Sequence, residues 1–223
     1  RVIPIGGWLL VGVILAIGLF YFARGQIRLK ASRTGRMMAR FSNFERTAHW
    51  TTAISFCVLA VTGLIVFVGK YLLLPIIGAE LFAWHTQICK VVHNCVGPVF
   101  AIAVLVLIFT FVRDNFPNAR DLLWIRKAGG LLSGEHVPSG RFNAGEKTWF
   151  WLGVVILSLV ASGSGFVLLF PNFDQSRAVM QNANLIHAIA AVLIICCALG
   201  HIYIGTLGME DAYGAMRTGV VDE

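Results

Sequence analysis

Long apolar stretches alternate with shorter polar segments along this chain, and five of the stretches are long enough to form membrane-spanning helices. About 20 residues are needed, because each helical residue adds about 1.5 Å and the hydrocarbon core is about 30 Å thick. The predicted spans are residues 3–23, 47–68, 82–112, 148–170 and 184–207. This pattern predicts an all-α integral membrane protein with five transmembrane helices.

The composition supports this class. The chain is 57% hydrophobic and 13% charged, whereas about 25% of the residues of an ordinary soluble domain are charged. The first apolar stretch is longer than the core of a signal peptide, so we count it as a span. The net charge of +7 does not indicate nucleic acid as a partner, because the basic residues lie in loops between spans rather than along one face.

The basic residues also predict the orientation of the chain. Residues 24–46 and 113–147 together hold thirteen of the 18 lysines and arginines. Loops rich in these residues stay in the cytoplasm. We therefore expect the N-terminus outside and the C-terminus inside, where the polar tail over 208–223 is predicted to form a short surface helix.

Four histidines fall inside the predicted spans and sort into two pairs by depth. His187 and His201 share the last span, about 21 Å apart and within about 40° of the same helix face. His49 lies near the cytoplasmic end of the second span, and His93 lies in the outer half of the third. We therefore pair His49 with His201 on the inner side, and His93 with His187 on the outer side.

The pairing indicates two b-type haems, each held between two neutral imidazoles. Arg46 precedes His49 by one helical turn and is a candidate partner for a haem propionate. Small residues would let the flat haem approach the helix backbone: Gly63, Gly97, Gly163, Gly165, Ala191 and Gly205.

Other interpretations of these histidines stay open. Histidines in membrane helices also hydrogen-bond to neighbouring helices, which would suit a transporter or scaffold without redox activity. A proton relay or metal-ion transporter would need acidic residues at mid-span, and here these lie in loops, in the tail or at span ends. His85 is the main rival of His93, and His136 is expected to be solvated. None of the five cysteines forms a C-x-x-C motif, so we expect neither an iron–sulfur cluster nor a covalently bound haem.

Five sequence blocks resemble the membrane cytochrome b (gamma) subunit of respiratory formate dehydrogenases. The resemblance covers residues 40 to 221. The blocks are RFSNFERTAHW (40–50), KVVHNCVG (90–97), RDNFPNARDLLW (113–124), RFNAGEKTWFW (141–151) and NLIHAIAA followed by GHIYIG (184–205). Two histidines fourteen residues apart on one helix and the N-A-G-E-K loop are the most specific features.

The resemblance implies a four-helix haem-binding bundle over 40–223, preceded over 1–39 by an extra transmembrane helix and a basic linker. It implies two haems b with the pairing given above, in a bacterial inner (cytoplasmic) membrane. Electrons would enter from an outer iron–sulfur (beta) subunit, which receives them from a molybdenum- or tungsten-containing alpha subunit that oxidises formate. They would leave to a quinone, menaquinone or ubiquinone, beside His201, Asn143 and the backbone of Gly145. The basic loops would also attract anionic membrane lipids.

One alternative function and one alternative role for a residue stay open. A diheme cytochrome b of the same architecture could serve a hydrogenase or a thiosulfate or polysulfide reductase, and only the loop blocks separate these. Asn143 is also suited to cap the helix that begins the fourth span, a role compatible with quinone binding.

Overall fold

The computed structural model describes residues 2–28, 34–130 and 137–222. Five long helices dominate it: α1 (Val2–Arg24), α2 (Asn43–Leu72), α4 (Ala79–Phe111), α7 (Ser158–Leu169) and α8 (Arg177–Tyr203). Shorter elements join or extend them: β1 (Met37–Ala39), α3 (Leu74–Ile77), η1 (Val112–Asn115), α5 (Ala119–Arg126), η2 (Ala128–Gly130), α6 (Ala144–Thr148), η3 (Trp149–Leu157), η4 (Ile204–Gly208), α9 (Ala212–Thr218) and β2 (Val220–Asp222).

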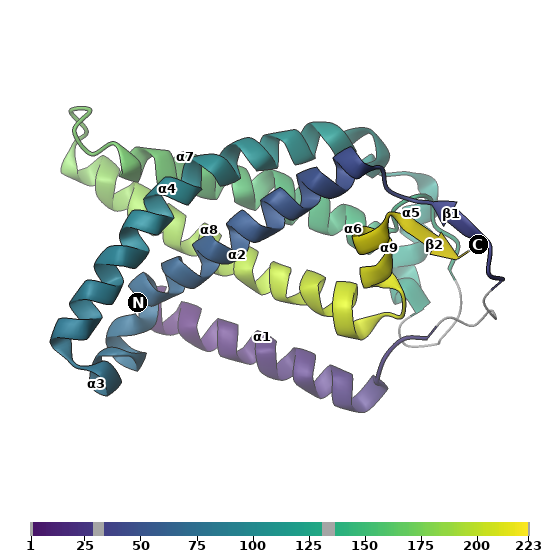
Figure 1. The fold of residues 1–223 in the computed structure, drawn as a ribbon, viewed down its shortest axis with the longest axis horizontal. Helices are drawn as coiled ribbons and strands as arrows, with labels where there is room; N and C mark the ends of the chain where they lie inside the picture. The colour runs from purple at the N-terminus through teal and green to yellow at the C-terminus, as the bar shows by residue number, and fades with distance from the viewer. Residues whose placement is uncertain (1, 29–33, 131–136, 223) are drawn as a thin grey trace.

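The long helices form a bundle of four with a fifth along its side (Figure 1). Helix α2 packs along α4, α7 packs along α8, and α4 and α7 join the two pairs. Helix α1 lies against α8, where Phe20 and Tyr21 both meet the ring of Tyr203 edge to face. Five helical segments of the described chain are long and apolar enough to cross a membrane, which confirms the predicted all-α membrane class.

Polar caps explain why the helices begin earlier than the apolar stretches. Ser42 caps α2 and Asn143 caps α6, each in a reciprocal pair of hydrogen bonds with a glutamate three residues later, Glu45 and Glu146. Such capping boxes satisfy backbone N–H groups that a helix start leaves free. The second and fourth spans therefore begin with a polar first turn that hydrophobicity does not mark.

The end of the bundle at the right of Figure 1 carries the basic loops and the tail. Strand β1 pairs there with β2 in a short antiparallel sheet, which the all-α prediction did not include. The tail forms the predicted short helix, α9. Arg46 and Trp50 of α2 both donate hydrogen bonds to the carbonyl of Met216, at 3.1 and 3.2 Å, so the tail is fixed to the bundle.

Arg141 links its own loop to the start of α2 and to η1 at this end. Its guanidinium forms ion pairs with Glu45 and Asp114, each at 2.6 Å. It also lies over the rings of Phe41 and Phe111, 5.4 and 5.9 Å from their centres. Segments far apart in the sequence are thereby held around the start of α6.

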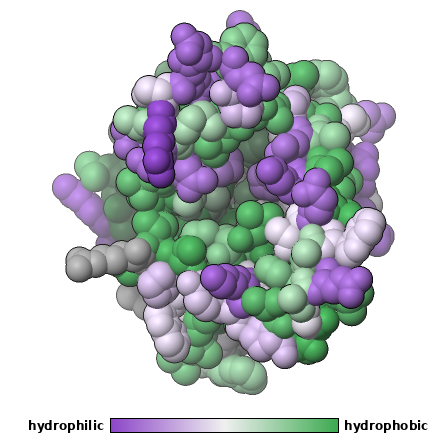
Figure 2. Space-filling view, turned by 90° about the vertical axis from the view of Figure 1, so that its left-hand side faces the viewer, coloured by the Kyte–Doolittle hydropathy of each residue, from purple (hydrophilic) through white to green (hydrophobic). Residues whose placement is uncertain are grey.

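The opposite end has shorter connections between the long helices. It consists of α3 between α2 and α4 and the connection from α7 to α8. Figure 2 looks onto this end, where hydrophilic residues gather mostly toward the upper rim and hydrophobic residues continue down the sides.

Lys147 anchors α5 to the bundle, and its loss should destabilise the protein. Its side chain is only 6% exposed, and Nζ donates to Asp121 at 2.8 Å and to the carbonyl of Phe116 at 3.1 Å. Removing the lysine leaves the partly buried carboxylate of Asp121 without its donor, which costs about 1–3 kcal/mol. We expect Lys147→Met to lower the unfolding temperature in detergent, and the exposed Arg113→Met to leave it nearly unchanged. Equal unfolding temperatures for Lys147→Met and wild type would contradict this role.

The same pair should make stability depend on acidity. Burial alone would raise the pKa of Asp121. Hydrogen bonds from Lys147 and from the backbone N–H of Asn118 lower the pKa by more than burial raises it, so it lies below its ordinary value. A lowered pKa stabilises the fold above the unfolded value of about 3.9, and this stability is lost as the pH falls through the folded pKa. The difference in unfolding temperature between wild type and Lys147→Met should therefore narrow below about pH 4. A difference that stays constant there would rule out this electrostatic contribution.

Candidate functional site

The structure brings the four span histidines together as two pairs. The ring centres of His49 on α2 and His201 on α8 lie 6.2 Å apart. Those of His93 on α4 and His187 on α8 lie 6.1 Å apart. His187 and His201 of α8 therefore each face a histidine of another helix, and the two pairs are separated by about four helical turns.

These separations fit an iron atom between each pair of rings. An imidazole nitrogen binds a first-row metal at about 2.0–2.1 Å, so two rings on opposite sides of one iron have their centres about 6 Å apart. The observed values of 6.2 and 6.1 Å match this spacing. If the histidine rings of each pair simply packed against each other, nothing would require the two pairs to have the same distance between ring centres.

Two imidazoles per site suit a metal that brings further ligands of its own. A structural zinc ion is held by about four protein ligands. Within residues 2–28, 34–130 and 137–222, no group of three or more His, Cys, Asp or Glu side chains is placed to hold a metal. A haem needs only axial ligands from the protein, because the porphyrin supplies four nitrogens.

In the outer pair, α7 holds the ring of His187. The Nδ1 atom of His187 lies 2.9 Å from the carbonyl oxygen of Ala161 and 3.3 Å from the hydroxyl of Ser164. A carbonyl only accepts, so Nδ1 carries the hydrogen and Nε2 keeps its lone pair. A Cβ added at Gly165 would come within 3.2 Å of the ring, so the absence of a side chain there makes room for the histidine.

Helix α2 holds His93 in the same way. Its Nδ1 lies 2.9 Å from the hydroxyl oxygen of Thr62. A Cβ added at Gly63 would come within 3.2 Å of the ring. A hydroxyl residue followed by glycine thus supports each outer histidine, although the two segments belong to different helix pairs.

The inner pair is held by aromatic rings instead. Trp149 stacks on His201 with ring centres 4.9 Å apart and planes inclined by only 14°. Trp50 meets His49 edge to face at 5.3 Å. The buried Nδ1 of His49 has no hydrogen-bond partner within the described residues.

Wider helical turns flank the inner pair. The segment η3, which begins at Trp149, and the segment η4, which begins three residues after His201, are both π-helical. The ring of Trp149 lies over Gly153, where a side chain would overlap it. Such π-helical insertions are frequent at functional sites because they re-aim side chains.

The glycines play two different roles. At Gly97 and Gly205, one turn after His93 and His201, an added Cβ would meet nothing within 4 Å. This open space fits the flat group expected there. Gly63 and Gly165 were also expected to face a haem, but the structure places them against histidine rings, as described above.

The structure assigns Asn143 the capping role, and leaves its amide group available. Its Oδ1 accepts from the backbone N–H of Glu146 at 3.0 Å. Its Nδ2 donates to no partner in the described part of the chain, so it can still donate to a ligand. Gly145 packs against Trp124, whose ring would be 2.9 Å from an added Cβ.

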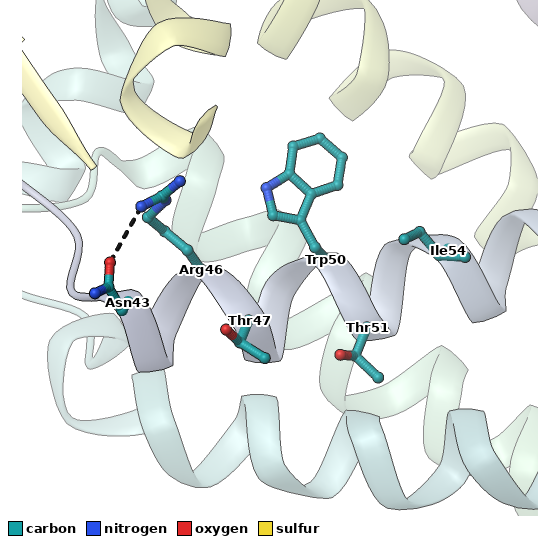
Figure 3. Close-up of a pocket in the computed structure, with 6 residues that line it drawn as sticks. All are labelled: Asn43, Arg46, Thr47, Trp50, Thr51 and Ile54. Atoms are coloured by element: carbon teal, nitrogen blue, oxygen red, sulfur yellow. Dashed lines mark hydrogen bonds between the residues drawn. The ribbon is translucent and has the colours of Figure 1, made fainter. Parts of the chain in front are cut away.

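Arg46 is used by the protein itself. Its Nη1 donates to Asn43 at 3.2 Å, and its other donors reach the carbonyls of Met216 and Arg217. Figure 3 shows Arg46 and Trp50 on the same side of α2, directed toward α9, beside a hollow of about 340 Å³. A contact between Arg46 and a haem propionate stays a prediction.

His85 is exposed on α4 and belongs to neither pair, and His136 lies outside the described residues. The five cysteines are free thiols.

Sequence reasoning missed Thr62, Ser164 and Trp149. The available signal was a hydroxyl residue directly before a glycine, at 62–63 and again at 164–165. Each of these dipeptides faces a histidine one helix away in the chain, but which face of the helix they occupy follows only from the fold. No comparable signal distinguishes Trp149 from neighbouring aromatic residues.

Similarity to known proteins agrees with this geometry. The family model described as prokaryotic cytochrome b561 matches residues 40–218. The cytochrome b556(fdo) subunit of formate dehydrogenase from Escherichia coli (strain K12) is 31% identical over 188 residues, which are 82% of this chain and 85% of that protein. The cytochrome b556(Fdn) subunit of the nitrate-inducible formate dehydrogenase of the same strain is 28% identical over 173 residues, 75% of this chain and 77% of that protein. The chain therefore belongs to the prokaryotic cytochrome b561 family.

Proposed function

We propose that this chain is the diheme cytochrome b subunit of a respiratory formate dehydrogenase. It would carry electrons from an iron–sulfur subunit outside the membrane to a quinone near the cytoplasmic side. The formate partner is inferred from the names of the relatives, which are formate dehydrogenase subunits. Formate oxidation itself would belong to a separate molybdenum- or tungsten-containing subunit.

The pairing of the histidines carries the proposal. His49 with His201, and His93 with His187, have ring centres at the spacing that one iron between two imidazoles requires. When bound, haem iron supplies reversible one-electron transfer. The chain's own contribution is to hold two such centres in one bundle, about 21 Å apart along α8.

The two levels lie at different depths in the membrane. Within this multi-pass protein, the inner pair lies toward the end that carries the basic loops. Under the proposed orientation, with the N-terminus outside the bacterial inner membrane and the C-terminus inside, that end faces the cytoplasm. An electron that passes from the outer pair to the inner pair crosses part of the membrane, and a full crossing corresponds to about 2.3 kcal/mol per 100 mV.

The quinone site is proposed at the start of α6, beside His201. Trp149 supports this position, because it follows α6 directly and stacks on His201. Asn143 would donate Nδ2 to a quinone carbonyl, and its Oδ1 would remain on the helix cap. The backbone at Gly145 would provide a second contact. Protons for the reduced quinone would come from the cytoplasmic side.

The proposed boundary between the regions lies at residue 40. Residues 1–39 would form the added helix α1 and its basic linker, and residues 40–223 the haem-binding unit. The family match, which begins at residue 40, supports this division.

Replacement of the α8 histidines should remove the haems one at a time. We expect His187→Ala to lose the outer haem and His201→Ala to lose the inner one, because each loses one of its two axial ligands. Haem content per chain and the reduced-minus-oxidised spectrum would measure this. His85→Ala, which changes an exposed histidine on α4, is the matched control and should keep both haems.

Two outcomes would contradict the ligand assignment. Full haem content in either α8 variant would show that the replaced histidine is not a ligand. A wild-type protein with one haem per chain, or with no b-type absorption band, would exclude the diheme proposal.

Two substitutions at Asn143 separate its capping role from quinone binding. Asn143→Ala removes both and should also cost about 1 kcal/mol of stability through the lost cap. Asn143→Asp keeps an oxygen for the cap but has no N–H to donate. We expect both variants to reduce quinone more slowly at unchanged haem content, with reduced thermal stability only in Asn143→Ala. Wild-type turnover with quinone in Asn143→Asp would show that Asn143 acts only as a cap.

A further inference from the structure

The two histidine pairs differ in what their Nδ1 atoms contact. Both outer rings have hydrogen-bond partners: Thr62 and the backbone of Leu59 for His93, and Ala161 with Ser164 for His187. In the inner pair, the buried Nδ1 of His49 has no partner within the described chain, and His201 stacks on Trp149. The protein thus supports chemically identical side chains in two different ways.

The hydroxyl of Thr62 has a defined direction. It donates its hydrogen to the carbonyl of Val58, four residues earlier, at 2.8 Å. Its oxygen is therefore free to accept, and the Nδ1–H of His93 is the donor in the 2.9 Å contact. Thr62 is 7% exposed, so little water competes for this bond.

Ser164 repeats the arrangement on α7. Its hydroxyl donates to the carbonyl of Val160, again four residues earlier, at 2.7 Å. Its oxygen then faces Nδ1 of His187 at 3.3 Å, and the carbonyl of Ala161 accepts from the same nitrogen at 2.9 Å. The glycine after each hydroxyl residue lets the ring reach this position.

We propose that Thr62 and Ser164 are positioning residues that lower the redox potential of the outer haem. This inference rests on the proposed ligand role of His93 and His187. A hydrogen bond from Nδ1–H makes Nε2 a stronger base, and a more basic ligand stabilises oxidised iron over reduced iron. Hydrogen bonding around the axial ligand is one of the ways in which a protein sets a haem potential.

The asymmetry favours electron movement in one direction. With both haems bound, one electron would leave the centre held by His93 and His187, oxidising it, and would reduce the centre held by His49 and His201. No bond is made or broken and no proton moves in this step. A lower potential at the outer pair makes this transfer toward the proposed quinone side more favourable.

The test is a redox titration of the intact chain with altered hydroxyls. Thr62→Val keeps the side-chain volume and removes the hydroxyl, and Ser164→Ala removes the other. We expect both variants to raise the midpoint potential of the outer haem and leave that of the inner haem unchanged. The rise should be smaller in Ser164→Ala, because the nearer carbonyl of Ala161 still accepts from His187, and largest in the double variant. The outer haem is identified beforehand as the one that His187→Ala loses. Electron paramagnetic resonance of the oxidised protein should show a shifted outer signal.

Rescue and control variants separate the hydrogen bond from a packing effect. Thr62→Ser and Ser164→Thr keep a hydroxyl and should keep the wild-type potential. Thr52→Val is the matched control: Thr52 lies on the same helix, is 8% exposed and donates to a carbonyl four residues earlier at 2.9 Å. It should leave the outer potential unchanged. If Thr62→Val loses the outer haem and Thr62→Ser keeps it, the result also supports the proposal, because the hydroxyl and not the volume then holds the ligand.

Failure of this inference differs from failure of the proposed function. Two haems per chain, correct losses in the histidine variants and an unchanged outer potential in both Thr62→Val and Ser164→Ala would overturn the inference alone. Thr52→Val shifting the outer potential as much as Thr62→Val would overturn it as well. A wild-type chain with fewer than two haems would instead overturn the diheme proposal on which it rests.

Discussion

The spacing of His187 and His201 on α8 is the constraint around which the bundle is arranged. Fourteen residues return a helix to nearly the same face, so both rings point to one side of α8 at two levels. Helix α2 supplies the inner partner and α4 the outer one, which requires both to lie along that side. The fourth helix, α7, then completes the bundle and supports His187 from its other edge.

Charged side chains at one end connect the loops to this apolar frame. Arg141 bridges Glu45 and Asp114, and Lys147 holds Asp121. Three of the five segments that resemble the formate dehydrogenase subunits, 40–50, 113–124 and 141–151, therefore converge at the same end of the molecule. Their convergence fixes α6 relative to His201, because Trp149, the residue directly after α6, stacks on the histidine ring.

The sequence was sufficient to predict the five spans and the two histidine pairs. The length of the apolar stretches predicts the spans. The helical repeat places His187 and His201 on one face, and the depth of each histidine in its span predicts its partner. Contacts that depend on how each helix is rotated about its axis could not be predicted from the sequence. Gly63 looks like a haem-facing glycine in the sequence, and only packing shows that it lies under His93. The short β1–β2 sheet was also missed, since three-residue strands carry too little pattern to be recognised.

The first helix and the segment after it contact the wide turn at the end of α8. Phe20 and Tyr21 of α1 enclose Tyr203, directly before the wide turn η4. A wide turn bonds its backbone less regularly than an α-helix, and hydrocarbon offers no replacement for weakened bonds. Here the segment after α1 supplies one bond that the turn needs, from the N–H of Ile27 to the carbonyl of Gly208 at 2.9 Å. Loss of α1 together with this segment would leave that carbonyl to water or to another protein chain, so the N-terminal part of the chain also fixes the backbone beyond α8.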